Sequence, residues 1–142
     1  MKDDNFTHHI NTLIKNYEQA NGRARFEMIK VNDTLIYTDI DQSLLDFVNL
    51  KRHDIIGKTF FDLPIKKHWA GKMSGIYENV WKGNETGYYS FPYSNENIFL
   101  IIAIRPIIVN GKTVKIEGRC APIENKEFDK GFSGTLIFLK DF

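Results

Sequence analysis

The 142-residue chain contains a single cysteine, which excludes a disulfide framework and a zinc site built from cysteines. Its formal net charge is only +1, so there is no bulk attraction to nucleic acid or to an acidic membrane. The longest uninterrupted apolar run, Ile98–Ile104, is too short to span a membrane. The N-terminal residues lack an apolar signal core, and we therefore expect a cytoplasmic protein without direct nucleic-acid or membrane partners.

Two Gly-Lys-Thr triplets, Gly57–Thr59 and Gly111–Thr113, lack the second glycine that a phosphate-binding loop requires. That loop places a glycine five positions before its Gly-Lys pair, because several backbone N–H groups must turn toward the phosphates. The corresponding positions hold Arg52 and Pro106, and proline has no N–H to offer. ATP or GTP binding by this route is disfavoured, and Asn110-Gly111 indicates a hairpin turn instead.

Arrangements typical of catalysis are also missing from the sequence. There is no serine elbow, no nucleophile paired with a histidine and no cluster of metal ligands. The pair His8-His9 lies on the polar side of a predicted helix and has no carboxylate at ligand spacing. The sequence therefore predicts a protein that is not an enzyme and has no metal site.

What is present is a series of helical and strand-like segments that predicts one α+β domain. Apolar residues at helical spacing predict an amphipathic N-terminal helix that ends at Gly22. We therefore divide the chain into this helix, residues 1–22, and a body of residues 23–142. The body opens with two short strands, Phe26–Val31 and Leu35–Ile40, and a strong helical stripe follows over Trp69–Trp81.

The last third of the chain is strand-like. Ile98–Val109 is largely apolar on both faces, Thr113–Ala121 alternates, and Thr135–Leu139 is again apolar. Tyr88–Tyr93 is left open between a strand and a loop, because Pro92 disfavours a central strand. We expect a five-stranded antiparallel sheet with helices on one face and the first helix packed separately.

A strand that is apolar on both faces needs cover on both sides. The middle helices can cover one face, and the first helix or a partner chain would have to cover the other. Because the apolar stripe of the first helix is narrow and accompanies a sheet that is apolar on both faces, we predict a homodimer. The predicted interface consists of part of the outer sheet face together with Phe6, Ile10, Leu13, Ile14 and Tyr17.

The body of the chain resembles a PAS sensory domain in the order and spacing of several short motifs. They stand for the second strand, the step from a short helix into a glycine-lysine pair, a hairpin turn, a proline-isoleucine strand ending and the last strand. Asp41, where the family usually has asparagine, and the long Thr86–Asn97 connection depart from the pattern. The matching segments are Leu35–Tyr37, Asn49–Lys58, Asn110–Lys112, Ala121–Ile123 and Gly134–Phe142.

The resemblance implies a signal-sensing domain of a bacterial-type regulator. Such a domain binds a small molecule or mediates dimerisation, and it relays through its C-terminal residues, here Asp141-Phe142, to an effector such as a kinase, a cyclase or a transcription regulator. Some members hold haem through a histidine in the region of His68, and non-covalent flavin is a second option. Cys120 lies outside the helix motif that attaches flavin covalently, and we expect no cofactor in the first instance.

The expected ligand site lies between the inner sheet face and the helix Trp69–Trp81. Trp69, Met73 and Tyr77 lie on one helical stripe, so the side chains of all three can point into the same space. Such a lining selects a flat or aliphatic molecule with a polar head at the rim. A filled core without a cavity is the alternative. The predicted lining consists of Phe61, Trp69, Met73, Tyr77, Ile101, Ile116 and Cys120, with Arg105 or His68 at the rim.

Two other functions remain open from the sequence. A small enzyme or ligand carrier of the nuclear-transport-factor-2-like type also combines an N-terminal helix with a curved sheet. It would place most helices before the sheet and would need an acid–base pair in its cavity. A purely dimerising interaction module would need no ligand, so detection of a bound molecule or of turnover separates the three readings.

Overall fold

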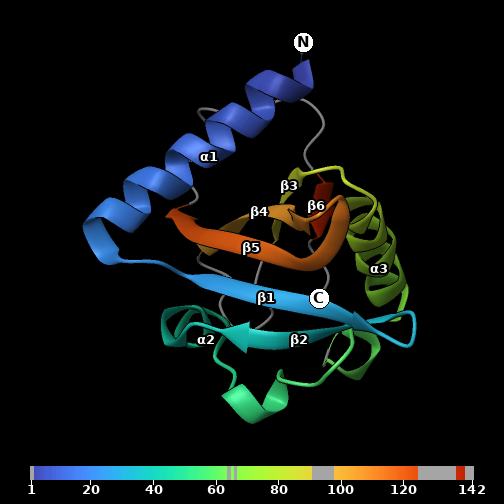
Figure 1. Ribbon diagram of the computed structural model, residues 1–142. Coiled ribbons are helices and arrows are strands. Elements are labelled where there is room, and N and C mark those ends of the chain that lie inside the picture. The colour runs from blue at the N-terminus through green and yellow to red at the C-terminus, as the bar shows by residue number, and fades with distance from the viewer. Residues whose placement is uncertain (1, 64, 66, 91–97, 125–136, 140–142) are drawn as a thin grey trace.

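One sheet runs through the molecule and carries helices on both sides (Figure 1). This computed structural model describes residues 2–63, 65, 67–90, 98–124 and 137–139. In chain order the elements are α1 (Lys2–Asn21), β1 (Arg25–Val31), β2 (Thr34–Ile40), α2 (Gln42–Val48), the 3-10 turns η1 (Arg52–Asp54) and η2 (Phe60–Asp62), α3 (Lys67–Trp81), β3 (Thr86–Ser90), β4 (Ile98–Val109), β5 (Lys112–Glu124) and β6 (Ile137–Leu139).

The strands lie in the order β2-β1-β5-β4-β3-β6. Neighbours among β1 to β5 are all antiparallel, which confirms the predicted five-stranded antiparallel sheet. The two hairpins turn at Asn32-Asp33 and Asn110-Gly111, and all four residues have positive φ angles. Asparagine, aspartate and glycine adopt that conformation at low cost, so the turn chemistry fixes the register of both hairpins.

The fifth antiparallel strand is β3, the segment that the sequence left open between strand and loop. Of the strand predicted over Thr135–Leu139, residues 135 and 136 lie outside the described ranges, and the rest forms β6, which pairs parallel to β3 at the edge of the sheet. Both β3 and β5 are antiparallel to β4, so β3 and β5 point in the same direction. Because β6 pairs parallel to β3, it points in that direction too.

The inner face of the sheet, defined as the face toward α3, holds the larger part of the core. The helix α3 buries Ala70, Met73, Tyr77 and Val80 at a spacing of three and four residues, which confirms the helical stripe predicted over Trp69–Trp81. These side chains pack against the alternating inward positions of the strands, among them Met28 and Ile116. The central strands therefore supply one continuous apolar floor for α3.

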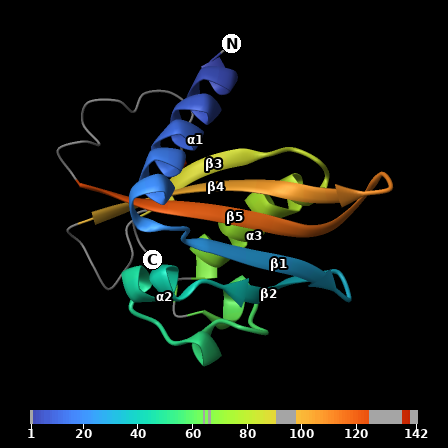
Figure 2. The same cartoon turned by 60° about the vertical axis from the view of Figure 1, so that its left-hand side comes forward.

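The helix α1 covers the outer face, on the opposite side of the sheet from α3 (Figure 2). Ile10 and Ile14 are 1% and 0% exposed, and they form a second core cluster with Ile101 and Ala121. The first helix thus packs separately from α3, on the opposite face of the sheet, as predicted (Figure 2). Burial of each isoleucine contributes roughly 1.5–3 kcal/mol to stability, and most of that is gained within the single chain.

The same packing engages part of the predicted dimer interface within the single chain. Two residues of the stripe, Ile10 and Ile14, are already buried within the chain, while Leu13 and Tyr17 are half-buried against the same cluster. The side chain of Phe6 lies outside the described part. The physical reason is that covering the outer face with its own helix avoids the loss of translational and rotational freedom that association costs.

The Gly57-Lys58 pair has a structural role beside β2. Gly57 N–H donates to the carbonyl of Tyr37 at 2.8 Å, and Tyr37 N–H donates to the carbonyl of Lys58 at 3.1 Å. Gly57 has a φ of 80°, which glycine adopts without steric cost. The segment therefore borders the sheet, in agreement with the rejection of a phosphate-binding loop.

Gly118→Ala should destabilise the fold by about 1–3 kcal/mol, because its Cβ would lie 2.1 Å from two ring carbons of the buried Phe26. Gly75→Ala on α3 is the matched control, since a Cβ there meets nothing within 4 Å. It should leave stability unchanged or raise it by about 1 kcal/mol. Urea denaturation measures both, and equal effects of the two substitutions would contradict this packing.

Candidate functional site

Aromatic rings fill much of the space between the inner sheet face and α3. We define Phe26, Tyr37, Phe60, Tyr77 and Tyr88 as the aromatic core. The ring of Phe60 lies 4.8 Å from that of Tyr77 and 5.8 Å from that of Tyr37, both edge-to-face. This geometry places the positive ring edge against the negative ring face and is the preferred one for aromatic pairs. The region expected to hold a ligand is therefore largely occupied by the chain itself.

The aromatic core contains one buried polar pair. The hydroxyl oxygens of Tyr77 and Tyr88 are 2.6 Å apart, and the two residues are 0% and 3% exposed. Burial raises the pKa of both phenols well above 10.0, because a phenolate would lose its hydration there. Both tyrosines are therefore neutral, and one hydroxyl donates to the other.

Cys120 lies on the inner face beside this pair and is fully buried. Burial raises the pKa of its thiol above the ordinary value of 9.0. Since the thiolate is the reactive form, the thiol is held in its inert state and packs as a small apolar group.

Trp69 has an unsatisfied donor at the start of α3. Its Nε1 is buried and has no hydrogen-bond partner within the described ranges. The exposed ring of His68 lies 4.8 Å from the indole, and Lys72 Nζ lies 5.2 Å from the indole centre. A buried N–H left without an acceptor costs about 1–3 kcal/mol, so the position favours an incoming acceptor.

The structure brings together part of the predicted lining. Met73, Tyr77, Ile116 and Cys120 are buried in the inner core, and the partly buried Trp69 packs against it. His68, the candidate haem ligand, is exposed in the first turn of α3. The predicted set thus has a common centre on α3 and β5, with His68 on its solvent side.

Three residues of the predicted set lie elsewhere. Phe61 is 60% exposed, because the η2 turn directs its neighbour Phe60 into the core. Ile101 faces α1 on the outer side of β4. Arg105 is exposed on the outer face, where its Nη2 lies 2.9 Å from Glu117, so it is not at the inner rim.

The predicted ligand-site lining omits four members of the aromatic core: Phe26, Tyr37, Phe60 and Tyr88. Strand alternation was a usable signal for two of them. Phe26 alternates with Met28 on β1, and Tyr37 alternates with Leu35 on β2, so both pairs face one side. Tyr88 had no such signal because the strand itself was left open.

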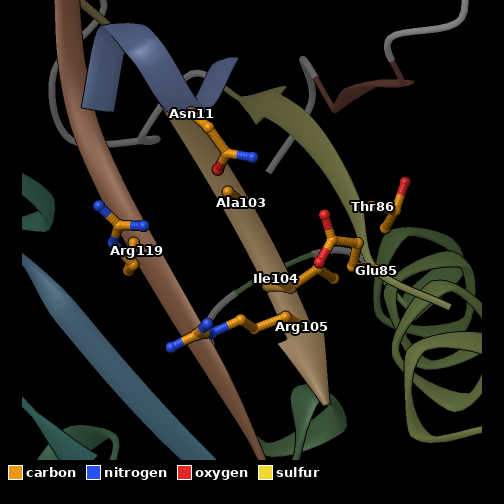
Figure 3. A pocket seen from close by; sticks show the side chains of 7 residues that line it. All are labelled: Asn11, Glu85, Thr86, Ala103, Ile104, Arg105 and Arg119. Carbon is orange, nitrogen blue, oxygen red and sulfur yellow. The ribbon is translucent and has the colours of Figure 1, made fainter. Parts of the chain in front are cut away.

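A polar pocket of about 120 Å³ lies on the outer face beside α1 (Figure 3). The Asn11 amide and the Glu85 carboxylate point into it from α1 and from just before β3. Its two cations already have carboxylate partners: Arg105 pairs with Glu117, and Arg119 pairs with Glu18 of α1. The pocket therefore belongs to a group of ion pairs on the outer face, one of which joins α1 to the sheet.

Further ion pairs lie on β1 and β5. The Glu27 carboxylate pairs with Arg25 at 2.5 Å and with Lys115 at 3.0 Å, and the Arg25 guanidinium also lies 3.8 Å from the Glu117 carboxylate. Such partly exposed pairs contribute about 0–1 kcal/mol each, so their main effect is to set the positions of β1 and β5 relative to each other and not to stabilise them strongly.

Solved structures with a similar fold are sensory domains. A light-oxygen-voltage protein from Rhodobacter sphaeroides matches with a TM-score of 0.59 and 11% identity over 87% of this chain and 72% of that one. A sensory box histidine kinase from Vibrio cholerae gives 0.54 and 12% over 85% and 97%. A dimeric LuxR-type receptor from Vibrio cholerae gives 0.58 and 15% over 80% of this chain and 52% of the receptor. No protein-family model and no curated protein matches the sequence.

At these identities the likeness establishes the fold. The chain has the PAS-like fold of light-oxygen-voltage domains, with an additional N-terminal helix. The competing nuclear-transport-factor-2-like fold is not supported. Across the described ranges no helix is both long and apolar enough to cross a membrane, and no group of three metal-ligating side chains comes together.

Tyr77→Phe and Tyr88→Phe should each lower the free energy of unfolding by about 1–3 kcal/mol, because each leaves the other buried hydroxyl without a partner. The double variant should cost less than the sum of the two, since neither hydroxyl remains. A double-mutant cycle by urea denaturation measures this coupling. Strictly additive costs would show that the two hydroxyls do not depend on each other.

Proposed function

We propose that the chain is a signal-sensing PAS domain. A ligand binds at the Trp69 end of α3, beside the aromatic core, and the response leaves through the outer face to an effector. The likeness of the fold to sensory box and light-oxygen-voltage domains supports a sensing role. The observation that carries the ligand site is Trp69, whose indole N–H is buried without an acceptor among the residues that the structure describes.

The ligand class follows from the groups around this donor. A carbonyl, carboxylate or ring nitrogen would accept the Trp69 N–H, while a flat or aliphatic body would contact Met73 and the neighbouring apolar side chains. The tyrosine pair Tyr77–Tyr88 is already closed by its own hydrogen bond. We therefore place the ligand at the Trp69 end of α3 and not beside the tyrosine pair. Haem at His68 and non-covalent flavin remain the alternative occupants.

β5 connects the ligand side to the outer face. Gly118 and Cys120 face the aromatic core, and Arg119 between them faces α1 and pairs with Glu18. A ligand that displaces β5 would therefore change the contact between β5 and α1 at this ion pair. Signal transfer requires that the ligand bind one of the two positions of α1 more tightly than the other. We propose that residues 1–22 are a movable cap on a sensing body of residues 23–142.

A homodimer and a downstream effector complete the proposal. The matched LuxR-type receptor is described as a dimer, and the other matched Vibrio cholerae protein is by name a sensory box sensor histidine kinase. Release of α1 would expose Ile10 and Ile14, which then become available for a second copy. The expected relay through Asp141-Phe142 lies outside the described residues.

Trp69→Phe should lower the affinity of the bound molecule by roughly fivefold, which corresponds to one neutral hydrogen bond of about 1 kcal/mol. Native mass spectrometry of protein purified from its own host measures the occupancy, and an absorption spectrum distinguishes haem from flavin. Trp81→Phe at the other end of α3 is the matched control and should keep full occupancy. Equal retention by both variants would remove Trp69 from the site, and a wild type without any small molecule would favour a purely dimerising module.

The purified chain should sediment as a dimer at protein concentrations of tens of micromolar, because ordinary dissociation constants of such dimers are about micromolar. Analytical ultracentrifugation over a dilution series measures the equilibrium. A clean monomer throughout that range would contradict the homodimer while leaving the ligand site untouched.

A further inference from the structure

A second pocket lies on the α3 side of the molecule, away from Trp69. It has a volume of about 230 Å³ and is bounded by the β1–β2 hairpin, the η2 turn and the middle of α3. Its lining contains two carboxylates and three hydroxyls but no cationic side chain. The apolar part consists of Leu35 and Phe60 at the back and Phe61 at the mouth.

The mouth residue Phe61 is 60% exposed, although large aromatic side chains are usually buried. The capped turn holds it there, because Phe61 N–H donates to Thr59 Oγ1 at 3.2 Å. An exposed ring face beside carboxylates attracts cations through its quadrupole. The ring therefore adds little to the core and is accessible from the pocket.

The two carboxylates differ in what they hold. Glu78 accepts from Lys30 Nζ at 2.6 Å, and the same ammonium lies 5.5 Å from the centre of the Trp81 ring. Glu78 thus already binds an ammonium group next to an aromatic face. Asp33 at the hairpin turn has no hydrogen-bond or ion-pair partner among the residues that the structure describes. Asp33 and Phe61 give this pocket the same two kinds of group, a carboxylate and an aromatic ring.

We infer that this pocket binds a small organic cation, an ammonium or guanidinium group on a short apolar stem. Asp33 and the free oxygen of Glu78 would hold the charge, Phe61 would cover it, and Leu35 and Phe60 would contact the stem. Lys30 limits the net negative charge near the pocket, which favours a monocation. The site is separate from the ligand site proposed at Trp69 and does not depend on it.

Occupancy of this pocket would reach the aromatic core. Phe60 forms the back wall of the pocket, and its ring lies 4.8 Å from Tyr77 and 5.8 Å from Tyr37. A cation that moves the η2 turn therefore moves a ring in contact with the centre of the sensing domain. The pocket is thereby a second input to the same fold.

The probe is n-butylammonium chloride, titrated into the full chain labelled with ¹⁵N and followed by NMR. We expect saturable shifts at Asp33, Phe61 and Glu78, with weaker binding as NaCl is raised. n-Butanol has the same stem without the charge, and butyrate reverses the charge, so both should bind far more weakly. No saturable shift with n-butylammonium up to about 50 mM, well above a millimolar dissociation constant, would overturn the inference.

Two conservative variants test the residues. Asp33→Asn keeps a side chain that tolerates the positive φ of the turn, and Phe61→Leu keeps apolar bulk without a ring face. Each should weaken n-butylammonium binding by about two- to fivefold, in line with exposed cation–π and ion-pair contributions. Asp46→Asn on the exposed side of α2 is the control and should bind as the wild type does. Unchanged binding in both pocket variants, or equal binding of n-butanol, would overturn the site.

Discussion

Burial of β4 on both faces is the constraint from which the rest of the structure follows. Leu100, Ile102 and Ile104 enter the inner core, while Ile101 and Ala103 face α1. Each aliphatic side chain left in water would forfeit roughly 1.5–3 kcal/mol, so neither face can stay open. A helix layer covers each side, and β4 separates the inner core under α3 from the outer cluster under α1.

Local patterns account for the part of the fold that could be predicted. The helical stripe of α3, the two hairpin turns and the alternating strand β5 each depend on residues close together in sequence, and the structure confirms them. The facing of Ile101 could not be obtained in this way. Alternation assigns a residue to a face only when one face is polar, and here both faces of the strand are apolar. The placement of α1 over that face decides the matter.

The candidate site was predicted in part for a related reason. Phe60 and Phe61 have the same chemistry and adjacent positions, so periodicity cannot say which one enters the core. The η2 turn decides it: Asp62 accepts from Thr59 N–H at 3.1 Å, a bond that also lowers the pKa of Asp62, and the closed turn directs Phe60 inward. Arg105 was misplaced similarly, since its partner Glu117 is brought beside it only by the β4–β5 hairpin.

The packing of α1 on the sheet has a consequence for synthesis of the chain on the ribosome. A Cβ at Gly87 would lie 2.7 Å from Ile10, so the helix rests directly on the backbone of β3, and it also packs against Ile101 and Ala121. The helix emerges first, whereas Ala121 follows about 110 residues later, roughly 5–20 s at ordinary translation rates. During that interval the sheet surface that covers the apolar stripe of the nascent helix has not yet formed. The stripe is then most accessible to chaperones or to a neighbouring nascent chain.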